Sequence, residues 1–140
     1  MAAEPLNERL SFGGISMDVL ATAETTGGAM TAIVEIPPLL DTPAHVHANE
    51  DELFVAIEGE HVITRGEEEI RIGPGQAVFA PRGVPHAQRR VVEGEGRLMF
   101  VCTPGGMEGF FRELAQAETE GRLGPEAYDA ASERFGITWL

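Results

Sequence analysis

Two histidines and a carboxylate stand close together near the middle of the chain, in the stretch HVHANEDELFVAIEG that starts at His45. In an extended strand the side chains of residues i and i+2 leave the same face, so we expect His45 and His47 to point into one space. Glu52 follows shortly after them and opens an apolar run. Imidazole and carboxylate groups that converge on one point suit a divalent metal ion. The stretch therefore predicts most of a metal site.

A second motif, further along the chain, supplies a possible additional ligand. It consists of Gly75, Pro81, Gly83 and His86, with a short spacer between it and the first motif. Together the two motifs resemble the signature of the cupin superfamily, in which HxH, Glu and Gly are followed by G, PxG and His. The match begins at His45, covers about a third of the chain, and has every one of these positions at the family's spacing.

The resemblance implies both a fold and a cofactor. Cupins are small jelly-roll barrels that hold a metal ion at their centre through three histidines and a glutamate. By this resemblance His45, His47, Glu52 and His86 are the ligands of one divalent transition metal ion per chain. Nitrogen and oxygen ligands suit iron, manganese, nickel, cobalt, copper and zinc alike, so the sequence leaves the identity of the metal open.

The sequence departs from the family's motifs at two positions. Leu39 stands where the family has a glycine before the first histidine, and Arg90 stands where it has an asparagine after the last. Neither position is a ligand, so the departures do not affect the predicted metal binding.

The segments around the motifs have the composition of short strands. Runs of β-branched and apolar residues alternate with turns rich in glycine and proline, which predicts roughly eight or more strands in a sandwich or barrel. The expected strands cover residues 15–20, 29–36, 53–57, 61–65, 69–72, 77–80, 86–91 and 97–102. We therefore predict an all-β protein, a single cupin jelly-roll barrel with a short C-terminal helical extension.

The helical extension is predicted from a change of period after Pro104. Met107, Phe110, Phe111 and Leu114 recur at the spacing of one face of an amphipathic helix. A second helix is expected to begin at Pro125, which needs no backbone N–H there, and to end before Gly136, which fits the left-handed residue past a helix end. Trp139, beyond this helix, is expected to pack back on the body or on a neighbouring subunit.

These patterns divide the chain into three parts. Residues 1–10 form a polar N-terminal leader that could lie along a sheet edge, residues 11–104 form the cupin β-barrel, and residues 105–140 form a C-terminal helical cap. At 140 residues the chain is long enough for one domain with one core. For a small jelly roll we also expect a homodimer built through strand edges.

Composition excludes several classes of partner and location. Ten basic and twenty-three acidic residues give a net charge of −13, which repels nucleic acid and anionic membrane surfaces. The N-terminal sequence has no apolar stretch typical of a signal or a membrane span, and the lone Cys102 forms no internal disulfide, so a cytoplasmic protein is expected. Cys102 lies in an apolar run and is expected to be buried without a role, whereas His61, outside both motifs, is expected at the surface.

Several residues are candidates for a substrate pocket beside the metal. Phe54 shares a strand face with Glu52, and Gln88 and Arg90 share one with His86. Arg90 could hold a substrate carboxylate or phenolate, or it could pair with an acid at the barrel rim. Phe110 could close over a flat substrate, or it could be ordinary core, as Phe54 could also be.

The most specific functional expectation again comes from resemblance. The run TPGGMEGFFREL is similar to the tail of small single-domain cupins of the quercetin 2,3-dioxygenase type, which implies a metal-dependent dioxygenase acting on a flavonol or another enolic or aromatic small molecule. Glu52 could then act both as a ligand and as the general base. The alternatives are a non-catalytic cupin that binds a small molecule, and a cupin isomerase or decarboxylase acting on a small acid.

Overall fold

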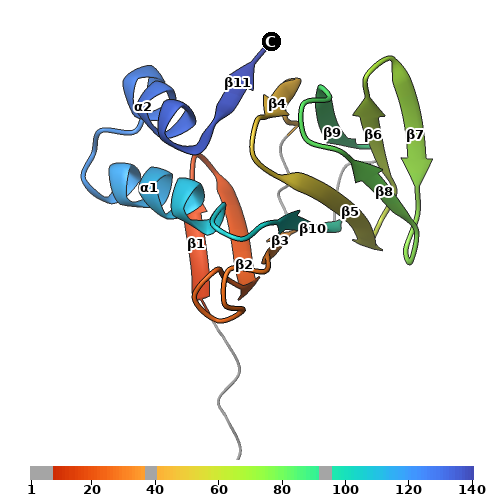
Figure 1. Ribbon diagram of the computed structural model, residues 1–140, viewed down its shortest axis with the longest axis horizontal. Coiled ribbons are helices and arrows are strands. Elements are labelled where there is room, and N and C mark those ends of the chain that lie inside the picture. The colour runs from red at the N-terminus through yellow and green to blue at the C-terminus, as the bar shows by residue number, and fades with distance from the viewer. Residues whose placement is uncertain (1–7, 37–40, 92–95) are drawn as a thin grey trace, which may run out of the picture.

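The structure, a computed structural model, describes residues 8–36, 41–91 and 96–140. Two antiparallel sheets face each other, and two helices lie beside one end of them (Figure 1). The helices come from the C-terminal part of the chain and are drawn in blue, at the end where strands β1 (Glu8–Phe12) and β11 (Ile137–Trp139) also lie.

The strands divide unequally between the sheets. The first sheet has the order β1-β2-β3-β10-β5-β8, and the second has the order β11-β4-β9-β6-β7. Each pair of neighbouring strands is antiparallel. The remaining strands are β2 (Ile15–Ala21), β3 (Thr31–Ile36), β4 (His45–His47), β5 (Asp51–Glu58), β6 (His61–Arg65), β7 (Glu68–Ile72), β8 (Ala77–Ala80), β9 (His86–Arg90) and β10 (Arg97–Thr103).

The core lies between the sheets, because side chains that alternate along each strand point inward at every second position. In β5 the inward face carries Glu52, Phe54 and Ala56, all of them buried. Phe54 and Ile63, which belong to opposite sheets, are part of one continuous hydrophobic core. The predicted all-β fold with a helical extension is confirmed, although no strand pairing among the described residues joins the sheets, so the jelly roll is a sandwich rather than a closed barrel.

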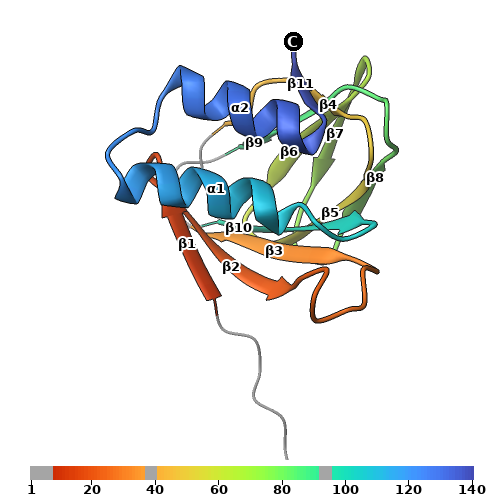
Figure 2. The same ribbon diagram turned by 60° about the vertical axis from the view of Figure 1, so that its left-hand side comes forward.

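Helices α1 (Glu108–Thr119) and α2 (Pro125–Phe135) lie side by side (Figure 2). Helix α1 packs against β1 of the first sheet, and α2 packs against β11 of the second. The predicted apolar stripe of α1 faces inward: Phe110 and Leu114 are buried, and Phe111 packs against the core. Helix α2 ends where Gly136 adopts φ +71°, as its sequence position predicts. A Cβ atom at Gly136 would lie 2.5 Å from Asn49 Nδ2, so a glycine lets the end of α2 approach the loop that follows His47.

The C-terminal tail forms a strand on the body of the same chain. In β11, Ile137 pairs with His47 and Trp139 pairs with His45, so the tail adds an edge strand directly beside the predicted metal ligands. The Trp139 indole N–H donates a hydrogen bond to Ser132 Oγ at 2.8 Å, which ties the tail to α2. The tail therefore helps to position the site.

One expectation about the histidines is wrong. His61 is buried, not at the surface, and its Nε2 lies 3.0 Å from the Glu58 carbonyl oxygen. Its strand β6 is interior to the second sheet, with β7 on one side and β9 on the other, so even its first residue is covered. Cys102, in contrast, is buried as expected.

The remaining sequence-based expectations concern the termini and the assembly. β1 begins at Glu8, within the predicted leader, and forms the edge of the first sheet, whereas residues 1–7 and Leu39 lie outside the described residues. Among the described residues no helix is long and apolar enough to cross a bilayer. The homodimer stays a prediction.

Candidate metal centre and its cavity

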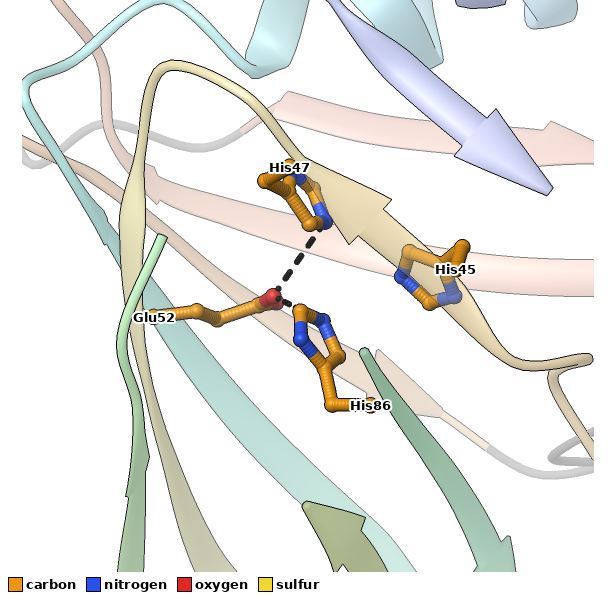
Figure 3. Close-up of side chains that lie close together, drawn as sticks. All are labelled: His45, His47, Glu52 and His86. Atoms are coloured by element: carbon orange, nitrogen blue, oxygen red, sulfur yellow. Dashed lines mark ion pairs between the residues drawn. The ribbon is translucent and has the colours of Figure 1, made fainter. Parts of the chain in front are cut away.

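The four predicted ligands meet in the interior of the sandwich. His45, His47, Glu52 and His86 each offer a ligand atom within 4.8 Å of those of the others, and all four side chains are buried. Figure 3 shows the three imidazoles arranged around the Glu52 carboxylate. Glu52 Oε2 lies 2.9 Å from His86 Nε2 and 3.4 Å from His47 Nε2.

Strand pairing explains how residues distant in sequence converge here. His45 and His47 leave the same face of β4, and His45 stands directly opposite His86 of β9. These three histidines belong to the second sheet, whereas Glu52 projects from β5 of the first sheet and reaches them across the core. The site is therefore held by both layers of the sandwich.

The polar atoms of the cluster are available for a metal ion. Glu52 Oε2 and His86 Nε2 are buried, and apart from the ion pair between them neither has a hydrogen-bond partner among the described residues. Leaving such atoms unpaired in a core is costly unless another group satisfies them. His45 also fits, because its Nδ1 lies 2.8 Å from the Pro43 carbonyl oxygen, and donation to that oxygen leaves Nε2 free as a ligand. The donor set thus fits a divalent transition metal.

Burial and the neighbouring charges shift the protonation of these groups. Burial lowers the pKa of His45 to about 4. Burial also acts to lower the pKa of His47, but the Glu50 and Glu52 carboxylates outweigh it, and the pKa of His47 is raised. For Glu52, burial acts to raise the pKa, yet the surrounding imidazoles lower it below the ordinary value. A neutral His45 and an ionised Glu52 are the protonation states that bind a metal.

Glu50 is a second buried acid next to this cluster. Its Oε1 lies 3.7 Å from His47 Nδ1, on the side of the imidazole away from Glu52, and neither atom has a hydrogen-bond partner among the described residues. A carboxylate behind a ligand histidine orients the ring and raises its basicity. Sequence reasoning missed this residue, because it is one of many acids in the chain and no spacing singles it out.

A cavity of about 220 Å³ opens from the metal cluster toward the helical cap. Its walls are mostly apolar and include a cluster of aromatic rings in which Phe111 lies near Phe12, Phe100 and Phe110. Trp139 lies at the metal end, with its ring centroid 4.9 Å from that of His45. The polar lining comes from His45, His47, Glu52, Glu35, Gln88, Asp41, Thr42 and Tyr128.

The predicted pocket residues take different places. Gln88 and Phe110 line the cavity, and Phe110 is at the same time buried core, so the two interpretations of this residue are compatible. Phe54 is buried, with its ring centroid 5.5 Å from that of His86. Arg90 is half-buried at the end of β9. Neither Phe54 nor Arg90 is among the described residues that line the cavity.

Glu35 of β3 is a cavity residue that the sequence motifs did not indicate. Its side chain is buried, and its Oε1 accepts a hydrogen bond from Gln88 Nε2 at 3.3 Å. Burial and the charge of Glu52 raise the pKa of Glu35 to about 8. The one signal in the sequence was an acid within the otherwise apolar run AIVEI.

A buried site of three histidines and a glutamate, placed between the sheets of an antiparallel jelly roll, defines a class of metal-binding β proteins. Comparison with known families names that class: the cupin domain family matches residues 32–103, just over half of the chain, and the protein belongs to the cupins. No curated protein matches the chain significantly.

Solved structures agree with this fold. KdgF from Halomonas sp. superposes with a TM-score of 0.64 at 17% identity, covering 78% of this chain and 99% of that one. TT1209 from Thermus thermophilus superposes with a TM-score of 0.60 at 29% identity, covering 74% of this chain and 98% of that one. An RmlC-like cupin from Shewanella frigidimarina superposes with a TM-score of 0.61 at 18% identity, covering 74% of this chain and 88% of that one.

Proposed function

We propose that this cupin is a metal-dependent dioxygenase acting on an uncharged phenol or enol, of which a flavonol is one example. The observation that carries the proposal is the position of the four-ligand cluster at the end of a cavity with mostly aromatic and aliphatic walls. Such walls fit a flat ring, and a few convergent polar groups can fix its orientation. The cavity volume of about 220 Å³ favours a compact molecule.

The charges around the cavity favour an uncharged substrate over a small acid. Of the described residues that line it, none is a lysine or an arginine, whereas Glu35, Asp41 and Glu52 are acids. A substrate carboxylate that lies away from the metal would have no side-chain counter-charge from that lining, and burying it there would be costly. A phenol or enol enters neutral and releases its proton only at the site. This argument ranks an isomerase or decarboxylase of small acids below the dioxygenase.

Each residue of the cluster then has a defined task. His45, His47 and His86 supply neutral nitrogen ligands, and Glu52 supplies an oxygen ligand. When bound, the metal would supply Lewis acidity toward the substrate hydroxyl and the activation of dioxygen. Glu52, ionised and within the cluster, accepts the hydroxyl proton of the substrate at its carboxylate. The aromatic walls and Trp139 exclude water from the reacting ring.

Oxygen uptake tests this proposal directly. Protein loaded separately with iron, manganese, cobalt, nickel or copper should consume dioxygen when a flavonol or a catechol is added, without an external reductant, because both oxygen atoms enter the product. Metal-free protein is the control. Tight binding without turnover would support the non-catalytic binding protein, and conversion without oxygen uptake would support the isomerase or decarboxylase.

Glu52 is tested separately by Glu52→Gln, which removes the basic carboxylate but keeps an oxygen ligand. At equal metal content, turnover should fall by about 100-fold or more, the usual contribution of a general base. Undiminished turnover with the metal retained would rule out the base role.

A further inference from the structure

Glu35 is a buried acid that the cupin motifs do not use. It projects from β3 into the cavity, with 7% of its surface exposed. Among the described residues its side chain makes a single hydrogen bond, to Gln88, which joins the first sheet to the second. No lysine or arginine of the described cavity lining offsets a charge on it. An acid in such a place is destabilising for the core unless it binds something.

Gln88 gives a second, independent indication that a ligand is bound at this point. Its Oε1 is buried and lacks a hydrogen-bond partner among the described residues, while its Nε2 is used by Glu35. Buried side-chain oxygens are nearly always satisfied, so an unpaired one in a cavity wall indicates a missing donor. A hydroxyl group on a ligand could donate to Gln88 Oε1 and also bond to the Glu35 carboxyl.

The distance of the Glu35–Gln88 pair from the metal cluster follows from the spacing of residues along β9. Gln88 and His86 lie two residues apart on the same face of β9, which separates them by roughly 7 Å. A separation of this size is close to that between a phenol oxygen and a hydroxymethyl oxygen on the opposite side of one aromatic ring. Between Glu35 and Glu52 the first sheet presents Phe100 of β10, an apolar residue of the cavity lining.

We propose that Glu35, held by Gln88, is a second recognition point of the site, and that it binds a hydroxyl on the side of the substrate ring opposite to the oxygen taken by the metal cluster. This inference rests on the proposed function and deepens it: the substrate is a ring with two oxygen functions across it. Because burial raises the pKa of Glu35, the carboxyl carries a proton at neutral pH and can donate as well as accept. A bound divalent ion reverses the contribution of the Glu52 charge, whereas burial, the larger cause of the raised pKa, remains.

Two phenols of the same size test the proposal. Cobalt(II)-loaded protein is titrated with 4-(hydroxymethyl)phenol and with 4-ethylphenol, which differ only in the terminal hydroxyl and methyl groups, and binding is followed by the cobalt absorption spectrum. The wild type should prefer the hydroxymethyl compound by roughly fivefold, the effect of one additional hydrogen bond. Equal affinities would overturn the role of Glu35 while leaving the proposed function in place.

Variants of single residues show whether Glu35 causes the preference for the hydroxymethyl compound. Glu35→Leu should abolish it, and Glu35→Gln should keep most of it because the amide still donates and accepts. Val34→Ala, on the opposite face of the same strand and outside the cavity lining, should leave it unchanged. If Glu35→Leu does not fold, Gln88→Leu takes its place. A preference that survives both leucine variants would refute the proposal. Failure of both phenols to perturb the cobalt spectrum of the wild type would overturn the proposed aromatic substrate itself.

Discussion

Two polar contacts between side chains of the described residues cross the interior of this sandwich, and they differ in what surrounds them. At the metal end, three histidines of the second sheet meet Glu52 of the first, with Glu50 and Trp139 behind them. Next to it along β9, Gln88 meets Glu35 in a mostly apolar cavity. The first contact brings several possible metal-ligand atoms to one point, whereas the second consists of one carboxyl group and one amide.

This difference teaches that a buried carboxylate takes its chemistry from its neighbours. Burial alone would raise the pKa of both glutamates, but the imidazoles lower that of Glu52, whereas Glu35 lacks such neighbours and its pKa rises to about 8. One acid is therefore ionised and suited to a metal and to accepting a proton. The other is protonated at neutral pH and suited to hydrogen bonding. Substitutions at the metal end test how far metal binding there is independent of the Glu35–Gln88 contact.

Removal of one ligand should have the largest effect. His47→Ala should reduce metal content from near one ion per chain to close to none, because a buried cluster with one donor missing no longer completes the ligand set. His61→Gln is the matched control, since His61 is also buried but, within the described part of the chain, its side chain bonds to a backbone carbonyl, and it should retain the metal. Metal analysis after gel filtration measures both. Full retention by His47→Ala would show that the metal is bound elsewhere.

Acidification should release the metal by protonating the same cluster. The raised pKa of His47 means that this imidazole takes up a proton at a higher pH than an ordinary histidine, whereas His45, with a pKa of about 4, stays neutral. Metal binding requires neutral imidazoles, so metal content should fall as the pH drops below about 6.5. Equilibrium dialysis across this range measures the loss. Metal content that stays constant down to about pH 4 would contradict the assignment of His47 as a ligand.

The two ends also differ in how far the sequence reveals them. The sequence reveals the four candidate ligands, because strand periodicity and motif spacing are local properties. The fold preserves these local patterns in β4, β5 and β9, which carry His45, His47, Glu52 and His86. Glu35 is paired with Gln88 only by the stacking of one sheet on the other, which no local spacing encodes. The burial of His61 was mispredicted for a related reason, because whether β6 is an edge or an interior strand depends on sheet order.

Glu50 should have an intermediate effect, because it supports a ligand without being one. Glu50→Gln removes the charge behind His47 and should weaken metal affinity by about 10- to 100-fold, the usual effect of losing such an outer partner. Asp51→Asn is the matched control: this neighbouring acid pairs with Arg82 instead and should leave affinity unchanged. Competition with a chromophoric chelator measures both constants. Equal losses in the two variants would point to general electrostatics rather than to the position of His47.

Trp139 should have the smallest effect, and one that separates substrate binding from metal binding. Its ring lies against His45 and lines the cavity, while the indole N–H holds the tail to Ser132. Trp139→Ala should weaken binding of 4-ethylphenol to the cobalt protein by about 3- to 10-fold, the contribution of one aromatic contact, with the metal content unchanged. Leu140→Ala, in the next and largely exposed residue, should behave as the wild type. If Trp139→Ala loses the metal as well, β11 is a structural part of the metal end, because its pairing with β4 then holds His45 and His47 in place.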